Sequence, residues 1–106
     1  MAQGTHLDGA ALKQLLPGKT LIVGEGASEG PYRIRLNADG AATALKGREP
    51  VQYDSGSWRV EGERFCRQWE KTKPLRLCLT VVADGGHIEL FDDNGLMLIN
   101  ARLSDD

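Results

Sequence analysis

The strand pairing predicted between residues 64–69 and 75–82 constrains the fold of this chain more than any other feature. In each run apolar side chains alternate with other residues, which is the pattern of a half-buried strand. If the two runs form a hairpin centred near Thr72, Cys66 lies opposite Cys78 and Phe65 lies opposite Leu79. A slip of one residue would break both matches, so the cysteines and the apolar faces agree on one register.

This register predicts a disulfide between Cys66 and Cys78. Opposed residues on paired strands have Cβ atoms about 4.5–5.5 Å apart, and a disulfide needs roughly 3.5–4.5 Å, so only the closer, non-hydrogen-bonded type of pair would serve. Two cysteines at this spacing favour an oxidising compartment. Met1 to Gly4 lack the apolar stretch of a signal peptide. We therefore expect a periplasmic or secreted protein in its mature form with an added Met, or a domain of a longer chain, with a cytoplasmic protein as the alternative.

The length and the turns favour a single small β domain. The chain has 106 residues, enough for one core, and 13 of them are glycine. Turn sequences such as Asn37 to Gly40 and Asp92 to Gly95 separate eight or nine short strands, and close turns favour antiparallel pairing of neighbours. We expect a mainly β fold: a small antiparallel up-and-down (lipocalin-like) barrel, or a curled meander, with one N-terminal helix. A β-sandwich is the alternative.

The expected layout divides the chain into four parts. They are a flexible start at 1–4, a helix at 5–16, antiparallel strands over 20–103 and a polar tail at 104–106. The apolar stripe of Leu12, Leu15 and Leu16 supports the helix, and Pro17 ends it. Within the strand region, 51–53 is expected to be a short strand and 54–56 a turn.

Several classes of function lack support in the sequence. The formal net charge is −2, which argues against a general nucleic-acid binder. No apolar run approaches the roughly 20 residues that span a bilayer. The soft metal ligands Cys66, Cys78, His6 and His87 lack the spacing of a zinc site, so we expect no metal and no cofactor. No catalytic constellation is recognisable, and we expect a protein that is not an enzyme.

Arg67 is the main candidate for a functional residue. It shares a strand face with Phe65 and Trp69, and a guanidinium that faces the interior needs a partner or a ligand anion. An internal carboxylate such as Glu89 would serve, and so would a side chain that reaches the barrel mouth. The candidate ligand-binding residues are therefore Arg67, Trp58 and Trp69.

The chain also resembles a group of small proteobacterial proteins. The resemblance rests on Gly56, Trp58, Val60 and Gly62, followed by Cys66-Arg67-Gln68-Trp69 and Cys78, and on the Asp84-Gly and Asn94-Gly turns. The predicted helix that precedes these residues, with its Leu-Leu-Pro-Gly-Lys-Thr sequence, is similar too. Many members of that group are exported and have no assigned activity. The resemblance implies an exported β domain with a paired cysteine hairpin, and it implies no catalytic residue.

These observations predict a binding protein. We expect an exported, non-enzymatic domain that binds a small ligand or a protein partner at the barrel mouth, as a monomer or weak oligomer. The alternative is an interaction or inhibitor module that acts through surface loops such as residues 25–30.

Overall fold

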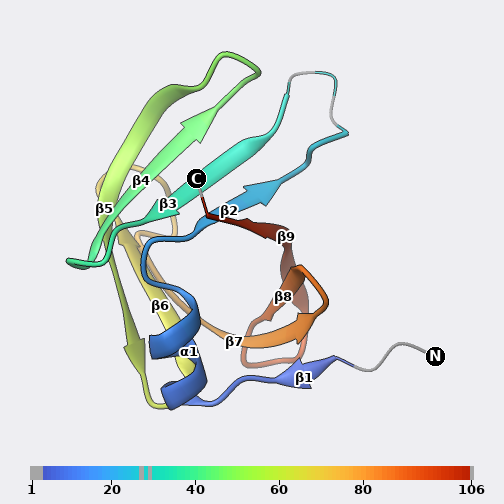
Figure 1. Ribbon diagram of the computed structural model, residues 1–106. Helices are drawn as coiled ribbons and strands as arrows, with labels where there is room; N and C mark the ends of the chain where they lie inside the picture. The colour runs from blue at the N-terminus through green and yellow to red at the C-terminus, as the bar shows by residue number, and fades with distance from the viewer. Residues whose placement is uncertain (1–3, 27, 29, 106) are drawn as a thin grey trace.

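The chain folds into a closed antiparallel β-barrel (Figure 1). The computed structural model describes residues 4–26, 28 and 30–105. In chain order the elements are β1 (Thr5–His6), α1 (Gly9–Leu15), β2 (Thr20–Val23), β3 (Tyr32–Leu36), β4 (Ala41–Lys46), β5 (Val51–Glu61), β6 (Arg64–Trp69), β7 (Arg76–Asp84), β8 (His87–Phe91) and β9 (Met97–Ser104). Each strand from β2 onward pairs with the next, and β9 pairs back with β2. The predicted up-and-down barrel is confirmed, and the β-sandwich alternative is wrong because one sheet closes on itself.

The register predicted for the cysteine hairpin is confirmed. In the ladder between β6 and β7, Cys66 pairs with Cys78 and Phe65 pairs with Leu79. The two cysteines form a disulfide. Beyond the last ladder pair, the backbone N–H of Trp69 donates to the carbonyl of Leu75 at 2.7 Å. Local alternation was a sufficient guide here because the two strands are joined by a short loop and share one buried face.

The start of the chain differs from the helix predicted at 5–16. The helix α1 begins only at Gly9, and the carboxylate of Asp8 caps it by accepting a hydrogen bond from the N–H of Ala11 at 2.9 Å. Thr5 and His6 form β1, which pairs with Ala83 and Val82 of β7. The β6–β7 ladder starts at the pair of Arg64 with Thr80, so this end of β7 has an edge that β1 can occupy. Thr5 and His6 are polar and show no apolar alternation, so the sequence does not predict a strand here.

The middle of the chain also differs from the prediction. The expected strand at 51–53, the turn at 54–56 and the strand after it are one strand, β5, of eleven residues. Ala44 of β4 pairs with Asp54, but the next residue, Leu45, pairs with Gln52. Tyr53 is therefore the extra residue of a β-bulge, which lets a turn-like sequence stay within a strand. The sequence analysis counted β5 as two strands and missed β1. These two errors cancel, so the expected number of strands is close to the observed number.

At the far end of the chain, β9 continues to Ser104, a residue that the sequence placed in the polar tail. The side chain of Asp105 forms an ion pair with Lys19. Most of the predicted flexible start (1–3), and Asp106 of the tail, lie outside the described residues.

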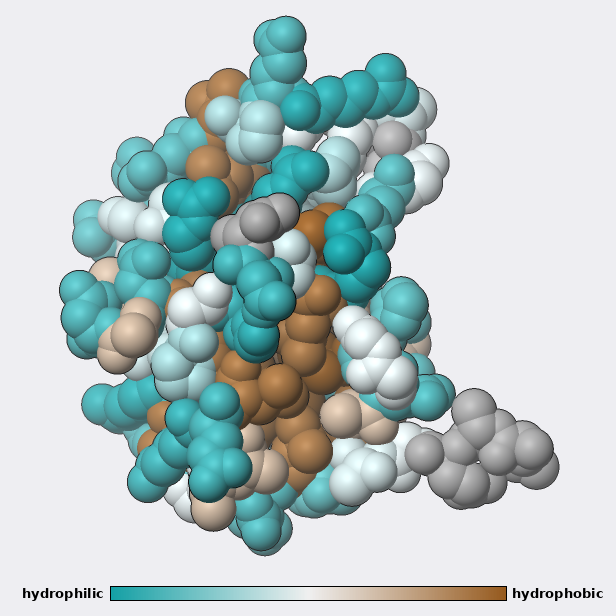
Figure 2. Space-filling model, in the orientation of Figure 1, coloured by the Kyte–Doolittle hydropathy of each residue, from teal (hydrophilic) through white to brown (hydrophobic). Residues whose placement is uncertain are grey.

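Helix α1 closes one end of the barrel. Its first residue, Gly9, lies against the β5–β6 turn, where an added Cβ would be 2.2 Å from the carbonyl oxygen of Gly62. Leu12 and Leu16 are fully buried in a core cluster that includes Trp58 and Phe65. Figure 2 shows apolar side chains filling the centre of the ring that the strands form in Figure 1. Side chains thus occupy the barrel axis, and a ligand has to bind at an end or on the outer surface.

The opposite end is called the mouth below. The connections β2–β3, β4–β5, β6–β7 and β8–β9 belong to it, because successive strands alternate in direction. Figure 1 shows the mouth ends of β3, β4 and β5, with the β4–β5 connection, projecting beyond the ring of strands. These projections create a surface that the core does not fill.

Candidate binding site at the barrel mouth

Arg67 faces the barrel interior, as its alternation with Cys66 predicts, and only 9% of it is exposed. Its Nη1 donates to the carbonyl oxygens of Pro74 at 2.5 Å and Leu75 at 3.3 Å, both at the mouth. The guanidinium lies 5.9 Å from the ring centre of Trp69. Burial lowers the pKa of Arg67 from its ordinary value, and the negative charge of Asp54 acts in the opposite direction. Arg67 thus holds the β6–β7 loop in place.

The carboxylate suggested for Arg67 from the sequence was Glu89. In β8, however, the residues on either side of Glu89, Ile88 and Leu90, are the ones buried in the core. Side chains alternate between the two faces of a strand, so Glu89 lies on the outer face. The carboxylate whose charge acts on Arg67 is Asp54.

Asp54 is a buried acid that the sequence analysis missed, with 3% of its surface exposed. Its Oδ1 accepts the N–H of Ser55 at 2.8 Å, and its Oδ2 accepts the N–H of Thr72 at 2.7 Å. The N–H of Lys71 donates to both oxygens, at 3.2 and 3.3 Å. Burial acts to raise the pKa of Asp54, but the hydrogen bonds outweigh it and lower the pKa to about 2. The Asp-Ser-Gly sequence is typical of a turn, but here it belongs to β5, where Asp54 pairs with Ala44 and shares the inward face with Trp58.

The two tryptophans lie in different parts of the interior. Trp69 is near the mouth beside Arg67. Trp58 pairs with Arg67 in the β5–β6 ladder, but its indole N–H donates at 2.8 Å to the carbonyl of Asn37, in the β3–β4 turn. That turn belongs to the end closed by α1. The structure therefore brings Arg67 and Trp69 together and directs Trp58 away from them.

A groove opens at the mouth on the inner face of the projecting strands. Its volume is about 440 Å³, and its lining residues are Gly30, Tyr32, Lys46, Gly47, Glu49 and Val51. The ladders pair Tyr32 with Lys46 and Lys46 with Val51, so the three side chains lie on one face. Tyr32 is 44% exposed and Val51 is 62% exposed. The groove thus offers apolar and aromatic surface to solvent.

Backbone contacts hold the two sides of this groove together. The N–H of Gly47 donates to the carbonyl of Pro31 at 3.0 Å. Gly30 has a φ of 92° and sits so close to the β4–β5 turn that an added Cβ would be 2.6 Å from the nitrogen of Arg48. Only glycine combines this backbone conformation with such a close approach. The groove is therefore formed before any ligand arrives.

Tyr53, the bulge residue, lies between the groove and the buried charges of Asp54 and Arg67. Its ring is 6.1 Å from that of Tyr32 in an edge-to-face arrangement, and the Nζ of Lys46 lies 5.5 Å from its centre. Burial raises the pKa of the Tyr53 hydroxyl, and so do the nearby groups of Tyr32 and Asp54. Two tyrosine rings and an ammonium group therefore stand together above the Asp54–Arg67 region. The alternation at Tyr32 was visible in the sequence, but the contact with Tyr53 depends on the bulge.

The loop at 25–30, the alternative binding surface, is anchored at its start. Arg102 of β9 donates from Nε and Nη2 to the two carboxylate oxygens of Glu25, each at 2.9 Å. This bidentate ion pair, with its two hydrogen bonds, lowers the pKa of Glu25. Ala27 and Glu29, which belong to the same predicted surface, lie outside the described residues.

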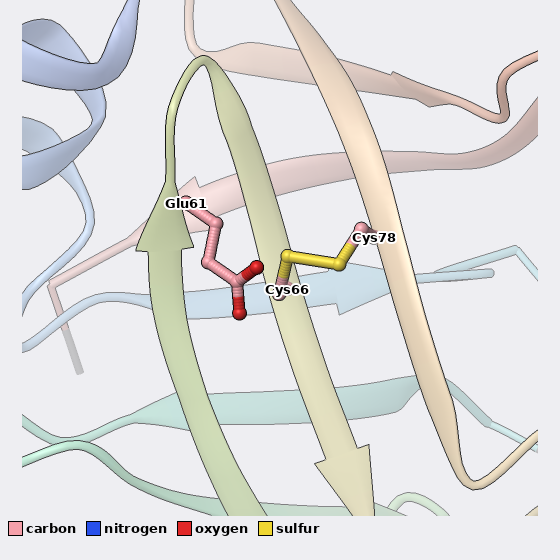
Figure 3. A group of neighbouring side chains, drawn as sticks. All are labelled: Glu61, Cys66 and Cys78. Atoms are coloured by element: carbon pink, nitrogen blue, oxygen red, sulfur yellow. A yellow bond between two sulfur atoms is a disulfide. The ribbon is translucent and has the colours of Figure 1, made fainter.

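The four soft ligands considered from the sequence are distributed differently in the fold. Cys66 and Cys78 are joined in the disulfide, and His6 and His87 are exposed residues of β1 and β8. Within the described part of the chain, the metal-ligating side chains that come together are Glu61, Cys66 and Cys78 (Figure 3). None of the described helices is long and apolar enough to cross a membrane.

Comparison of the chain with protein-family models, with curated proteins and with solved structures found no match. The resemblance to small proteobacterial exported proteins therefore stays a prediction. The disulfide is consistent with an oxidising compartment.

Proposed function

We propose that this protein is a non-enzymatic binding module, exported to the periplasm or secreted, whose ligand occupies the groove lined by Tyr32, Lys46 and Val51. The observation that carries the proposal is the groove itself: about 440 Å³ in volume, with two exposed apolar side chains. Sites for small ligands usually measure about 300–1,000 Å³ and combine apolar walls with a few polar groups. The filled interior directs the ligand to the mouth.

The side chains of the groove favour a ligand with a flat apolar part and an anionic group. Tyr32 and Val51 supply surface for the apolar part, and an aromatic group can stack against the exposed ring of Tyr32. Lys46, on the same face, supplies the cation for a carboxylate. Glu49, at the rim, disfavours ligands with several negative charges. A free aromatic carboxylate, or such a group on a protein partner, meets these requirements.

Nuclear magnetic resonance titration tests this proposal. Benzoate and related aromatic carboxylates, with aromatic amines of equal size as controls, are added to ¹⁵N-labelled protein. We expect the carboxylates to shift the amide signals around Tyr32, Lys46 and Val51. We expect Tyr32→Ala and Lys46→Ala each to weaken binding at least about fivefold, while Leu96→Ala, at another residue with 61% exposure, leaves it unchanged.

Two results would overturn the groove as the binding site. One is the absence of shifts there at millimolar ligand. The other is a set of shifts confined to residues 24–28, which would favour the alternative, an interaction or inhibitor module acting through the 25–30 loop.

A further inference from the structure

Three potential metal ligands meet on the outer face of the barrel wall, the opposite face of the sheet from the groove. Figure 3 shows Glu61 at the end of β5 with its carboxylate turned toward Cys66 of β6, and Cys78 beyond it on β7. A carboxylate oxygen and the two sulfur atoms all lie within 4.8 Å of one another. The ladders pair Arg59 with Cys66 and Cys66 with Cys78, so backbone hydrogen bonds hold the three strands in place independently of the disulfide.

The cluster gains two metal ligands when the disulfide is reduced. A low-molecular-weight thiol can act as the reductant: two thiols of the reductant lose two electrons and two protons and become a disulfide, while Cys66 and Cys78 become thiols. A divalent metal then displaces the two thiol protons and forms two metal–sulfur bonds.

The distances suit a tetrahedral zinc ion. Zinc binds sulfur at about 2.3 Å and carboxylate oxygen at about 2.0–2.2 Å, so the sulfur atoms would be about 3.8 Å apart and each about 3.6 Å from the oxygen. The Cα atoms of Cys66 and Cys78 are 4.0 Å apart, and rotation about χ1 after reduction brings the two sulfur atoms to this separation. One carboxylate oxygen of Glu61 is already within 4.8 Å of both sulfur atoms, so it lies at most about 1.2 Å beyond the oxygen–sulfur distance of a zinc site.

Two arginines place positive charge next to the cluster. Arg59 Nε and Arg76 Nη2, the latter at 2.8 Å, both bind Oε2 of Glu61. They orient the carboxylate, and cations next to a cysteine favour its thiolate form. Two thiolates and a carboxylate around Zn²⁺ leave one net negative charge, which the arginines offset. The side chain of Glu61 is 39% exposed, so the ion has a path from solvent.

We propose that reduction of the Cys66–Cys78 disulfide creates a site at which Glu61, Cys66 and Cys78 bind one Zn²⁺ ion, with water as the fourth ligand. Three protein ligands and one water form a common open zinc site. The site is separate from the mouth groove and does not rest on the ligand proposed there. It forms only where a thiol reductant opens the disulfide, so an exported protein in an oxidising compartment holds no zinc at this site.

Titration of the reduced protein with Zn²⁺ and with Cd²⁺ tests the site. The protein is reduced with a phosphine, which is removed under anaerobic conditions before metal is added. Isothermal titration calorimetry measures the stoichiometry and Kd for zinc, and ultraviolet absorbance detects cadmium–thiolate bonds. We expect one ion per reduced chain and at least about 100-fold weaker binding to the oxidised protein. We expect Glu61→Gln to weaken binding at least about tenfold.

The control variant is Glu63→Gln, which removes a carboxylate from the same β5–β6 turn and should bind zinc like the wild type. Both substituted residues are partly or fully exposed, so both variants keep the disulfide hairpin and the core. Equal zinc binding by Glu61→Gln and the wild type would overturn the proposal. So would equal weakening by Glu63→Gln, or the absence of cadmium–thiolate absorbance in the reduced protein.

Discussion

The buried carboxylate of Asp54 accepts a hydrogen bond of 2.7 Å from the backbone N–H of Thr72, a residue eighteen positions further along the chain. The same carboxylate accepts the N–H of Lys71, and Arg67 donates to the carbonyl oxygens of Pro74 and Leu75. The carboxylate of Asp54 on β5 thus binds N–H groups of the β6–β7 loop, and the guanidinium of Arg67 on β6 binds carbonyl oxygens of the same loop. Together they shape the mouth next to the proposed groove.

Asp54 should make the stability of the protein depend on pH in the acid range. Its pKa is lowered to about 2 in the fold, so the folded state favours the ionised carboxylate. That stabilisation is fully present above the unfolded pKa of about 3.9 and is lost as the pH falls toward about 2. We expect Asp54→Asn to unfold at lower urea than the wild type at pH 7, with a smaller difference at pH 2.5. Asp39→Asn, at an exposed position, is the control, and an equal pH dependence in wild type and Asp54→Asn would contradict the assignment.

Replacing Arg67 should loosen the β6–β7 loop. Arg67→Met leaves the carbonyl oxygen of Pro74 without its Arg67 donor and removes the cation beside Trp69. The carbonyl oxygen of Leu75 loses one of two donors and keeps the backbone N–H of Trp69. The expected loss in the free energy of unfolding is about 1–3 kcal/mol, the usual cost of an unsatisfied buried polar group. Urea denaturation followed by tryptophan fluorescence measures it. Arg35→Met, at an exposed position of β3, should cost much less, and equal losses would show that Arg67 has no special role.

Removing the disulfide should destabilise the fold without changing it. The bond joins residues twelve positions apart, and a closed loop of this size stabilises a protein by about 3 kcal/mol through the unfolded state. The variant with both Cys66→Ala and Cys78→Ala should unfold at correspondingly lower urea and keep its β-sheet circular dichroism. Thiol labelling of the denatured, non-reduced wild type should find no reactive cysteine. Two reactive thiols would rule out the disulfide in the isolated protein.

Gly56 should tolerate no side chain. It lies on β5 opposite Trp69, and an added Cβ would be 1.8 Å from the backbone oxygen of Gln68. Backbone atoms on a paired strand cannot move aside, so we expect Gly56→Ala to cost about 3 kcal/mol. Gly86→Ala, where a Cβ meets nothing within 4 Å, should stay within about 0.5 kcal/mol of the wild type. Thermal unfolding compares the two, and a neutral Gly56→Ala would show that the strands separate easily here.

Local patterns predicted much of the barrel. Alternating apolar residues identified β6 with its observed bounds, located β7, and placed Cys66 opposite Cys78. Each of these strands has one face in the core, so apolar residues recur at every second position of its sequence. The inward direction of Arg67 followed from the same period.

The candidate site was harder to predict because it depends on contacts between distant segments. The sequence drew attention to Arg67, Trp58 and Trp69, but the exposed groove uses Tyr32, Lys46 and Val51 from three strands. Tyr53 reaches Tyr32 only because a bulge interrupts the ladder between β4 and β5. Neither the bulge nor the packing of Gly30 on Arg48 leaves a local signal.

The sequence by itself determined the strand periods, the turns and the register of the cysteine hairpin, because each depends on residues close together in the chain. Only the tertiary structure decided how the barrel closes, where β1 pairs and which groups bind the carboxylate of Asp54. Closure joins β9 to β2, and β1 occupies an edge of β7 that exists only because β6 starts at Arg64, opposite Thr80. Burial of Asp54 depends on backbone N–H groups of a loop that reaches it in the folded state alone.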